Sequence, residues 1–504
     1  MNLAKLAEDR VKEQGERPSL IFEDREITNV EMVRIARKLG RALQDLGVRK
    51  GDRVILQMPN CPEVLQGFQA VWRIGAVVVP INYLVGEAET AYIYEDSGAK
   101  VVISSLAFLP KIRAARARVP SLETVILIDP EVPEGTLSYR QIVERSPEEP
   151  DVVETADDEL AALIYTAGTT GRPKGVMHSH FSLYSNAHMQ YESIPLPDGL
   201  TTIMVLPLCH SFGIATVNQG LFRRGGKAVL LNSFQVETIL ASIQKYRANT
   251  MAGVPTMYVF MLLYPEPRKY DLSSMKYWIS GAAPLALETW KKFKEVYGFE
   301  IIEGWGLTEA GANNSVNPFE GLRKVGSIGR PMKGTEIRIV DQRGNRLPPG
   351  KEGEIVIRGP MLMKGYWKKP EETAEVLKDG WLHTGDIGYV DEDGYFWITD
   401  RKKDLIIKAG ENISPRAIEE VLFGHPKVSE AAVIGIKDGV YGEDIKAFVI
   451  LKPGQTATPT EIIEYCRTKL SSLLVPKEVV FNKALPKNLV GKVLKKELRK
   501  LKSE

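Results

Sequence analysis

Hydrophobic residues at helical spacing mark the first clear element of the chain. Thr28 and Glu31 form a capping box, in which each side chain satisfies a free backbone N–H at the start of a helix. Gly47 provides a stop signal. The apolar positions between them repeat every three or four residues: Met32, Ile35, Ala36, Leu39, Leu43 and Leu46. The pattern predicts a helix over 28–46.

Short apolar runs then alternate with helical patterns. We predict strands over 53–58, 76–81 and 160–164, with a helix over 63–73. The acidic, proline-bearing stretch 144–159 is interpreted as a surface connection, after which the alternation continues to about residue 297. Strands alternating with helices indicate an α/β fold, in which helices cover largely parallel sheets.

The pattern changes twice in the second half of the chain. Residues 326–357 predict short β segments joined by turns, as in a small β subdomain. Beyond about residue 404 we expect strands over 430–436 and 445–451 and an amphipathic helix near 460–473, before a lysine-rich end. The sequence therefore predicts a large N-terminal domain over 1–400, a connection at 401–404 and a small α+β C-terminal domain over 405–504.

Charge and composition exclude several classes of function. The 66 Lys and Arg residues against 64 Asp and Glu give a net charge of +2, so we expect no nucleic-acid partner. Three widely spaced cysteines fit neither a disulfide framework nor a zinc site. Neither a signal peptide nor an apolar stretch of about 20 residues is present, so we expect no transmembrane segment and a cytoplasmic protein. The oligomeric state is not readable from the pattern. The HSH stretch at 178–180 lacks a third ligand for a transition metal.

A stretch rich in glycine and threonine, YTAGTTGRPKGV at 165–176, follows the predicted strand over 160–164. Glycines let backbone N–H groups face an anion, threonine hydroxyls add donors, and Lys174 adds a charge suited to phosphate. The stretch is not a P-loop, because Pro173 precedes that lysine and Gly175 follows it. It indicates a phosphate site, with a flexible glycine turn as the alternative.

Three further stretches carry candidate chemistry. In GWGLTEAG (304–311), Trp305 suits base stacking, Thr308 a phosphate oxygen and Glu309 a magnesium ion. Asp386, in TGD, suits two vicinal ribose hydroxyls. Lys492 lies in PKNLVGKVLKKEL near the C-terminus. Taken singly, these stretches could equally be a core tryptophan beside a helix cap, an ordinary turn and a solvated basic tail.

Taken together and in this order, these motifs resemble those of the adenylate-forming enzymes, the superfamily of acyl-CoA synthetases, firefly luciferase and peptide-synthetase adenylation domains. The segments GVRKGDRV, GAVVVPIN, PLCHSFG and SGAAPL extend the resemblance over essentially the whole chain. The resemblance implies an AMP-forming acyl-CoA synthetase. A carboxylic acid and ATP would give acyl-AMP and pyrophosphate with the help of Mg²⁺, and coenzyme A would then take the acyl group.

The resemblance also implies roles for individual residues. Thr308 would contact the α-phosphate, Glu309 would hold Mg²⁺, Asp386 and Arg401 would bind the ribose, and Lys492 would bridge the carboxylate and the α-phosphate. The residues implied for the β- and γ-phosphates are Thr166, Gly168, Thr169, Thr170, Gly171 and Lys174. Those implied for the adenine are Gly281, Ala282, Ala283, Pro284 and Trp305, which would stack on the base.

For the second half-reaction, the resemblance implies a mobile C-terminal domain that swings about Lys403. The swing would withdraw Lys492 and bring Gly410 beside the pantetheine tunnel. His210 would lie near the acyl and thiol path, with a buried structural histidine as the alternative. Gly306 stands where acetyl-CoA synthetases carry a pocket-closing tryptophan, which suggests room for a medium-chain, fatty or aromatic acid. The acyl pocket is also expected to draw on Val254, Ala282 and Ala283.

Two other functions remain open at this point. The protein could be an acyl-AMP ligase or an adenylating enzyme that loads a carrier protein, although no carrier domain follows Lys492. It could also be a non-catalytic nucleotide-binding scaffold. The presence of Lys174, Glu309, Asp386 and Arg401 together with that lysine favours an enzyme.

Overall fold

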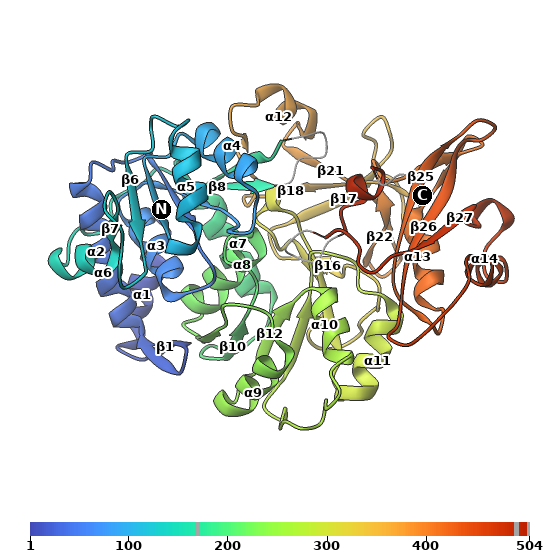
Figure 1. Cartoon of the computed structure of the whole chain (residues 1–504), viewed down its shortest axis with the longest axis horizontal. Coiled ribbons are helices and arrows are strands. Elements are labelled where there is room, and N and C mark those ends of the chain that lie inside the picture. The colour runs from blue at the N-terminus through green and yellow to red at the C-terminus, as the bar shows by residue number, and fades with distance from the viewer. Residues whose placement is uncertain (167–171, 488–492, 501–504) are drawn as a thin grey trace.

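The computed structural model describes residues 1–166, 172–487 and 493–500. Within these residues the chain forms four sheets. Figure 1 shows the two large sheets in the N-terminal part, one above the other, and the sheet of the C-terminal part at the opposite side of the molecule. The α/β class and the separate C-terminal domain that the sequence predicted are confirmed. In the described ranges, none of the helices has the length and apolar character needed to cross a bilayer.

Two large sheets build the N-terminal part. The nine-stranded sheet has the order β16-β15-β14-β13-β12-β10-β11-β1-β2, and the eight-stranded sheet has the order β19-β9-β8-β4-β3-β5-β6-β7. The first contains β1 (Pro18–Phe22), β2 (Arg25–Thr28), β10 (Thr201–Met204), β11 (Lys227–Leu230), β12 (Thr250–Gly253), β13 (Tyr277–Ser280), β14 (Ile301–Trp305), β15 (Ser315–Val316) and β16 (Arg330–Pro331). The second contains β3 (Arg53–Gln57), β4 (Val77–Pro80), β5 (Val101–Ser104), β6 (Thr124–Leu127), β7 (Leu137–Ser138), β8 (Leu160–Thr166), β9 (Lys174–Ser179) and β19 (Gly365–Tyr366).

Helices cover these sheets because each buries an apolar face against the strands. Phe68 and Trp72 of α3 stack with ring centroids 5.4 Å apart in the largest core cluster, and the indole N–H of Trp72 donates to Ala161 O of β8. The helices of this part are α1 (Lys5–Gln14), α2 (Asn29–Asp45), α3 (Pro62–Arg73), α4 (Glu87–Ser97), η1 (Leu106–Phe108), α5 (Leu109–Arg116), α6 (Tyr139–Arg145), α7 (His180–Ser193), α8 (Ser211–Thr216), the π-helix η2 (Val217–Arg223), α9 (Val236–Tyr246), α10 (Pro255–Leu262), α11 (Leu287–Tyr297) and η3 (Thr308–Ala310).

A five-stranded antiparallel sheet forms the predicted β subdomain. Its long hairpin, β21–β22, pairs Asp386 with Arg401. Its first two strands are short and lie within 336–358, largely in the region where the sequence predicted short β segments. Its elements are β17 (Glu336–Val340), β18 (Gly353–Arg358), β20 (Leu377–Lys378), β21 (Trp381–Val390), β22 (Phe396–Arg401) and the helix α12 (Pro370–Val376).

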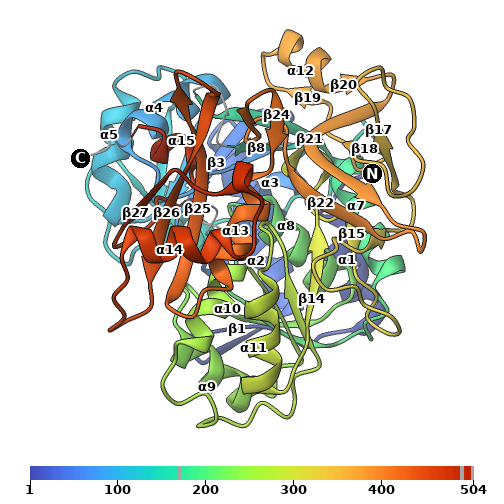
Figure 2. The ribbon, with the colours of Figure 1, turned by 90° about the vertical axis from the view of Figure 1, so that its right-hand side faces the viewer.

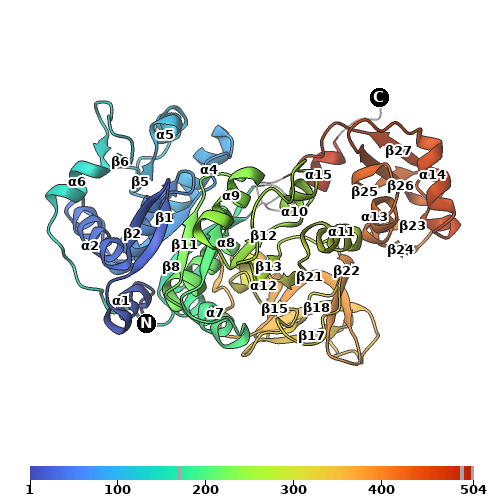
Figure 3. The same ribbon diagram turned by 90° about the horizontal axis from the view of Figure 1, so that it is seen from below.

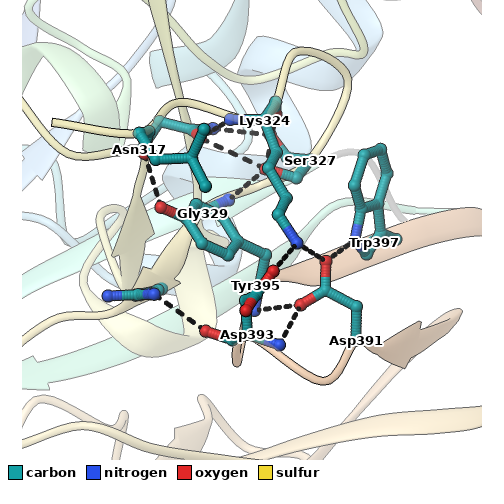
Figure 4. Close-up of polar contacts among 10 residues, drawn as sticks. Asn317, Lys324, Ser327, Gly329, Asp391, Asp393, Tyr395 and Trp397 are labelled. Atoms are coloured by element: carbon teal, nitrogen blue, oxygen red, sulfur yellow. Dashed lines mark hydrogen bonds and ion pairs between the residues drawn. The ribbon is translucent and has the colours of Figure 1, made fainter. Parts of the chain in front are cut away.

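Lys324 anchors the β21–β22 hairpin to the loop between β15 and β16 (Figure 4). Its ammonium lies 2.7 Å from Asp391 Oδ2 and 2.6 Å from Asp393 Oδ2, and Trp397 Nε1 donates to the same Asp391 oxygen at 3.0 Å. Burial raises the pKa of Asp391, but the hydrogen bonds from Lys324 and Trp397 outweigh it and lower the pKa to about 2. The hairpin is therefore fixed to the nine-stranded sheet.

The C-terminal part has its own sheet and core (Figure 2). The chain leaves the β subdomain at Arg401 and enters the last sheet at Ile406. Two points remain predictions: the connection at 401–404 is a hinge, and the two parts move. The elements of this part are β23 (Ile406–Lys408), β24 (Glu411–Ile413), β25 (Val428–Asp438), β26 (Gly442–Leu451), β27 (Glu478–Phe481), α13 (Pro415–Phe423), α14 (Pro459–Arg467), η4 (Ser472–Leu474) and α15 (Lys495–Leu498).

The start of α13 contacts the last strand before the connection. Ser414 Oγ lies 2.7 Å from Asp400 Oδ2 and 2.9 Å from Thr399 O, and Arg416 Nη1 donates to Ile398 O at 2.5 Å. Figure 3 shows α13 beside α11 of the N-terminal part. These contacts define how the C-terminal sheet sits on the rest of the molecule.

Candidate active site

Three residues expected at the nucleotide meet around one carboxylate. Asp386 is only 2% exposed, and its Oδ2 accepts a hydrogen bond of 2.9 Å from Trp305 Nε1. Its Oδ1 lies 2.8 Å from Arg401 Nε. The charge of Asp386 is the main cause of a raised pKa of Arg401, so the guanidinium stays protonated. The Asp386 carboxylate, with one partner on each oxygen, thus joins the end of β14 to the β21–β22 hairpin.

Thr308 and Glu309 lie directly beyond β14, in η3. The Thr308 hydroxyl is 2.9 Å from Ser211 Oγ at the start of α8. Tyr366 donates its phenolic O–H to Glu309 Oε1 at 2.9 Å. Burial, followed by the Glu309 charge, raises the pKa of Tyr366, so the phenol remains a donor. Tyr366 could not be identified from the sequence, because it lies 57 residues from Glu309.

Lys174 lies on the other side of Tyr366. Its ammonium is 4.9 Å from the centre of the phenol ring, a cation–π distance, and it forms an ion pair with Glu372 of α12. The expected phosphate-binding lysine is therefore held by a carboxylate. Neither Tyr366 nor Glu372 was identified from sequence.

His178 fixes the backbone of Thr308. Its Nε2 lies 2.6 Å from Thr308 O and its Nδ1 lies 3.0 Å from Ser182 Oγ. Burial lowers the pKa of His178 to about 4, so the ring is neutral, and the carbonyl partner requires the proton on Nε2. The HSH stretch thus supports the site by positioning. The parts of the chain described contain no group of three or more His, Cys, Asp or Glu side chains suited to a metal.

The glycine-threonine stretch connects two antiparallel strands. Thr166 at the end of β8 pairs with Lys174 at the start of β9. A P-loop instead joins a strand to a helix, so the connection between β8 and β9 is not a P-loop, and its binding of phosphate stays a prediction. Gly168, Thr169, Thr170 and Gly171 lie outside the described residues.

Residues 281–284, expected at the adenine, follow β13. Ala282 has a φ of 69°, in the left-handed region that a residue with a Cβ seldom adopts and that recurs at functional sites. A Cβ added to Gly281 would lie 3.2 Å from the Phe212 ring and 3.5 Å from Gly304 O. The absence of a side chain therefore allows this stretch to approach the end of β14.

The remaining predicted residues lie toward the C-terminal part. Lys403 is exposed and follows Arg401 of the Asp386–Arg401 pair by two residues. Gly410 lies at an exposed turn between β23 and β24 with a φ of 83°. In the described part of the chain, the hydrogen bonds and ion pairs of the Asp386 pair do not extend to Gly410. Lys492 lies outside the described residues.

A cavity adjoins residues 281–284 and the end of β14, since Gly281 and Gly304 lie in its wall. It lies between the nine-stranded sheet, α7 and the π-helix η2. Its lining is formed by Gln190, Ile194, Leu196, Pro197, Leu200, Thr202, Phe212, Thr216, Gln219, Gly220, Arg224, Gly226, Thr250, Ala252, Ile279, Ser280, Gly281, Gly304, Asn313, Ser315, Val316 and Met332.

The cavity corrects the expected role of Gly306. A Cβ at this residue would lie 1.4 Å from Ala312 O, so the glycine serves close backbone contact and opens no space for an acyl group. It does not line the cavity, nor do Val254, Ala282 and Ala283. The glycines that do form the wall are Gly220, Gly226, Gly281 and Gly304.

His210 and its neighbour Cys209 lie at the start of α8. The Nδ1 of His210 accepts the backbone N–H of Phe212 at 3.2 Å, so the imidazole caps this helix. Burial raises the pKa of the Cys209 thiol to about 12. His210 lies beside the cavity without lining it, and its predicted place on the acyl and thiol path stays a prediction.

Comparison with known proteins agrees with this geometry. Residues 7–367 match the AMP-binding enzyme family and residues 417–492 match the AMP-binding enzyme C-terminal domain. The chain is 36% identical to a long-chain-fatty-acid–CoA ligase of Bacillus subtilis, covering 96% of this chain and 91% of the relative. It is also 36% identical to a feruloyl-CoA synthase of an Amycolatopsis species, with 94% of each chain covered.

Solved structures agree as well. The anthranilate CoA ligase AuaEII in complex with anthranoyl-AMP superimposes with a TM-score of 0.93 at 30% identity, covering 99% of this chain and 97% of the other. On this sequence and structural similarity, the chain belongs to the AMP-binding enzyme family.

Proposed function

We propose that this protein is an AMP-forming acid–thiol ligase, which converts a carboxylic acid and ATP to acyl-AMP and pyrophosphate and then transfers the acyl group to coenzyme A. One observation carries the proposal: Trp305, Thr308, Glu309, Asp386 and Arg401, from three separate segments, gather at the end of β14, whose Gly304 lines the cavity. The family and its CoA-ligase relatives support the same activity.

The first step brings a carboxylate to a polyanion, so its barrier is dominated by charge and positioning. The carboxylate oxygen forms a bond to the α-phosphorus while the bond to the bridging oxygen of pyrophosphate breaks. In this proposal Thr308 donates to the α-phosphate, Lys174 and the glycine-threonine hairpin bind the departing phosphates, and Lys492 neutralises charge at the α-phosphate. Such fixed charges act most strongly in a site that excludes water.

The oxygen donors near Thr308 fit a magnesium ion, since Mg²⁺ is usually bound by one or two carboxylates together with substrate phosphates. Glu309 would hold it, because its carboxylate is fixed by Tyr366 in an otherwise oxygen-rich position. When bound, Mg²⁺ supplies positive charge to the phosphates. Asp386 would accept the ribose hydroxyls, with Arg401 orienting its carboxylate.

The second step requires the acyl-AMP to meet a thiol. We propose that the C-terminal domain turns about Lys403, which withdraws Lys492 and presents the Gly410 turn to the thiol path. The exposed position of that turn is compatible with this role. A domain that assembles two sets of catalytic groups in succession is an established way to run two reactions in one site.

The products test the reaction. Purified protein with ATP, Mg²⁺, coenzyme A and a panel of carboxylic acids is expected to yield AMP, pyrophosphate and a thioester. Formation of ADP and phosphate would refute adenylation. Pyrophosphate release with accumulation of acyl-AMP and no thioester would instead favour an acyl-AMP ligase or a carrier-loading enzyme, and the absence of turnover with every acid would favour a scaffold.

Lys492→Ala tests the assignment of the C-terminal lysine. We expect this variant to lose acyl-AMP formation yet to transfer the acyl group from supplied acyl-AMP to coenzyme A at close to the normal rate. Lys487→Ala is the matched control, since Lys487 lies in the same segment and pairs with Glu430 at 2.5 Å. Equal losses in both half-reactions would contradict the domain movement.

A further inference from the structure

The two ends of the cavity can be distinguished by the parallel strands that line it. Ser280 lies at the carboxyl end of β13, next to the nucleotide stretch, whereas Thr250 lies at the start of β12. The register pairs Gly253 with Ser280 and Thr250 with Tyr277, so the two ends are three residues apart, or about 10 Å. The acid's carboxylate belongs at the Ser280 end, and the rest of the molecule extends toward Thr250.

Gln219 lies at the far end. It belongs to the π-helix η2, and the carbonyl of the next residue, Gly220, accepts the backbone N–H of Gly226. Lys227, which follows, pairs with Thr201 at the start of β10. Short π-helical segments are rare and often occur at functional sites. The π-helix thus places an amide side chain where the body of the acid would end.

The amide of Gln219 carries an unused donor. Its side chain is 7% exposed, and its Nε2 has no hydrogen-bond partner within the described ranges. Ser280 Oγ, in a side chain 1% exposed, has the same property at the near end. A buried donor without a partner is unfavourable unless a ligand supplies an acceptor. The cavity is therefore apolar over most of its wall but offers donors at its two ends.

Arg224 shows that the far end suits a neutral group. Its guanidinium donates to the carbonyls of Tyr191 and Ile194, at 2.9 and 2.6 Å, and to that of Leu196. Tyr191 lies in the last turn of α7, and the other two residues follow this helix. Asp198 lies 3.7 Å from the same guanidinium. The two terminal nitrogens of this guanidinium are thus engaged by a helix C-terminus and an aspartate, and within the described ranges only its buried Nε lacks a partner, so the guanidinium is not set to bind a carboxylate of the acid through both terminal nitrogens.

We propose that the acid carries a neutral hydrogen-bond-accepting oxygen, such as an alkoxy, hydroxyl or carbonyl group, at the end remote from its carboxylate, and that Gln219 selects it by donating from Nε2. This inference rests on the proposed ligase function. It excludes acids with plain alkyl chains and leaves compact acids with a polar end. A site with a fixed donor discriminates against an analogue that leaves the donor unpaired.

Pairs of acids that differ only at that end test the inference. We would measure kcat/KM for pyrophosphate release with 4-methoxycinnamate against 4-ethylcinnamate, and with 4-methoxybenzoate against 4-ethylbenzoate. In at least one pair, the oxygen-bearing acid is expected to be favoured by about tenfold, the effect of one neutral hydrogen bond. Gln219→Leu is expected to bring that ratio to about one or to reverse it.

Gln69→Leu is the matched control. Gln69 is 1% exposed on α3 and both of its amide atoms lack partners, but it does not line the cavity, so its removal should leave the ratio unchanged. A wild-type preference for the ethyl acids, or for hexadecanoate over all four, would overturn the inference and leave the ligase function standing. So would a ratio that Gln219→Leu does not move. If Gln219→Leu fails to fold, the wild-type ratios decide. Absence of AMP with every acid would instead refute the proposed function, and this inference with it.

Discussion

Glu303 is expected to make the protein less stable as the pH rises toward neutrality. This half-buried carboxylate lies on β14, two residues before Trp305, and its Oε2 accepts the backbone N–H of Gly326 at 3.0 Å. Burial raises its pKa to about 7, although the Gly326 hydrogen bond and the charge of Arg416 in the C-terminal part oppose the shift. Glu303→Gln replaces it with a neutral group of the same shape.

The direction in which pH changes the free energy of unfolding follows from proton binding. Between pH 4.5 and about 7 the folded protein keeps a proton on Glu303 that the unfolded chain has released, so raising the pH favours unfolding. The difference between about 7 and 4.5, at about 1.36 kcal/mol for each pH unit, amounts to about 3 kcal/mol in all. About 2.5 kcal/mol of this falls between pH 5 and pH 8.

Urea unfolding of the wild type and of Glu303→Gln at pH 5 and at pH 8 measures the effect. The variant is expected to resemble the wild type at pH 5 and to be more stable at pH 8 by about 2–3 kcal/mol. Taking the difference between the two proteins cancels the titration of all other groups. A difference that stays the same at both pH values would refute the reasoning.

Glu300→Gln supplies a control of opposite sign. Glu300 lies just before β14, and a hydrogen bond from Lys294 is the main cause of its lowered pKa, which burial opposes and Arg323 reinforces. Its stabilising effect is present above the unfolded pKa and is lost as the pH falls through the folded one. This variant should therefore be less stable than the wild type by a similar amount at pH 5 and pH 8, and a gain at pH 8 would contradict the assignment.

Three further predictions concern the site. Gly306→Ala should lower the free energy of unfolding by about 1–3 kcal/mol, or prevent folding, because the new Cβ meets Ala312 O; an unchanged melting temperature would contradict this. Trp305→Phe should raise KM for ATP at least tenfold by removing the N–H donor to Asp386, while an effect confined to KM for the acid would count against a nucleotide role. EDTA should abolish pyrophosphate release and added Mg²⁺ restore it, and full activity in EDTA would exclude the magnesium site.

Local patterns predicted the fold well where neighbouring residues decide the structure. The helix expected over 28–46 is α2 (Asn29–Asp45). Thr28 Oγ1 accepts the N–H of Glu31 at 3.1 Å, which is one half of the predicted capping box, whereas the Glu31 carboxylate accepts from Arg25 at 2.5 Å. The predicted strands and the helix over 63–73 correspond to β3, β4, β8 and α3, and differ from them only by a residue or two at their ends. These elements follow from spacing and capping alone.

The site was less predictable because its contacts join distant segments. Nothing near Glu309 in the sequence indicates that Tyr366 would bond it, and the HSH stretch gave no sign that His178 would hold the Thr308 carbonyl. Gly306 misled for another reason. A glycine that makes room for a ligand and a glycine that lets two backbone segments touch look identical in sequence, and only the position of Ala312 O separates them.

The protonated state of Cys209 has a consequence for the acyl-AMP itself. A mixed anhydride is an electrophile that any thiolate can attack, and Cys209 lies next to His210, on the segment expected to border the acyl path. Because burial raises the pKa of this thiol to about 12, almost none of it is thiolate at neutral pH, and thiolate is the nucleophilic form. The protein can therefore form a reactive acyl donor beside one of its own cysteines without acylating itself, which leaves the donor for coenzyme A.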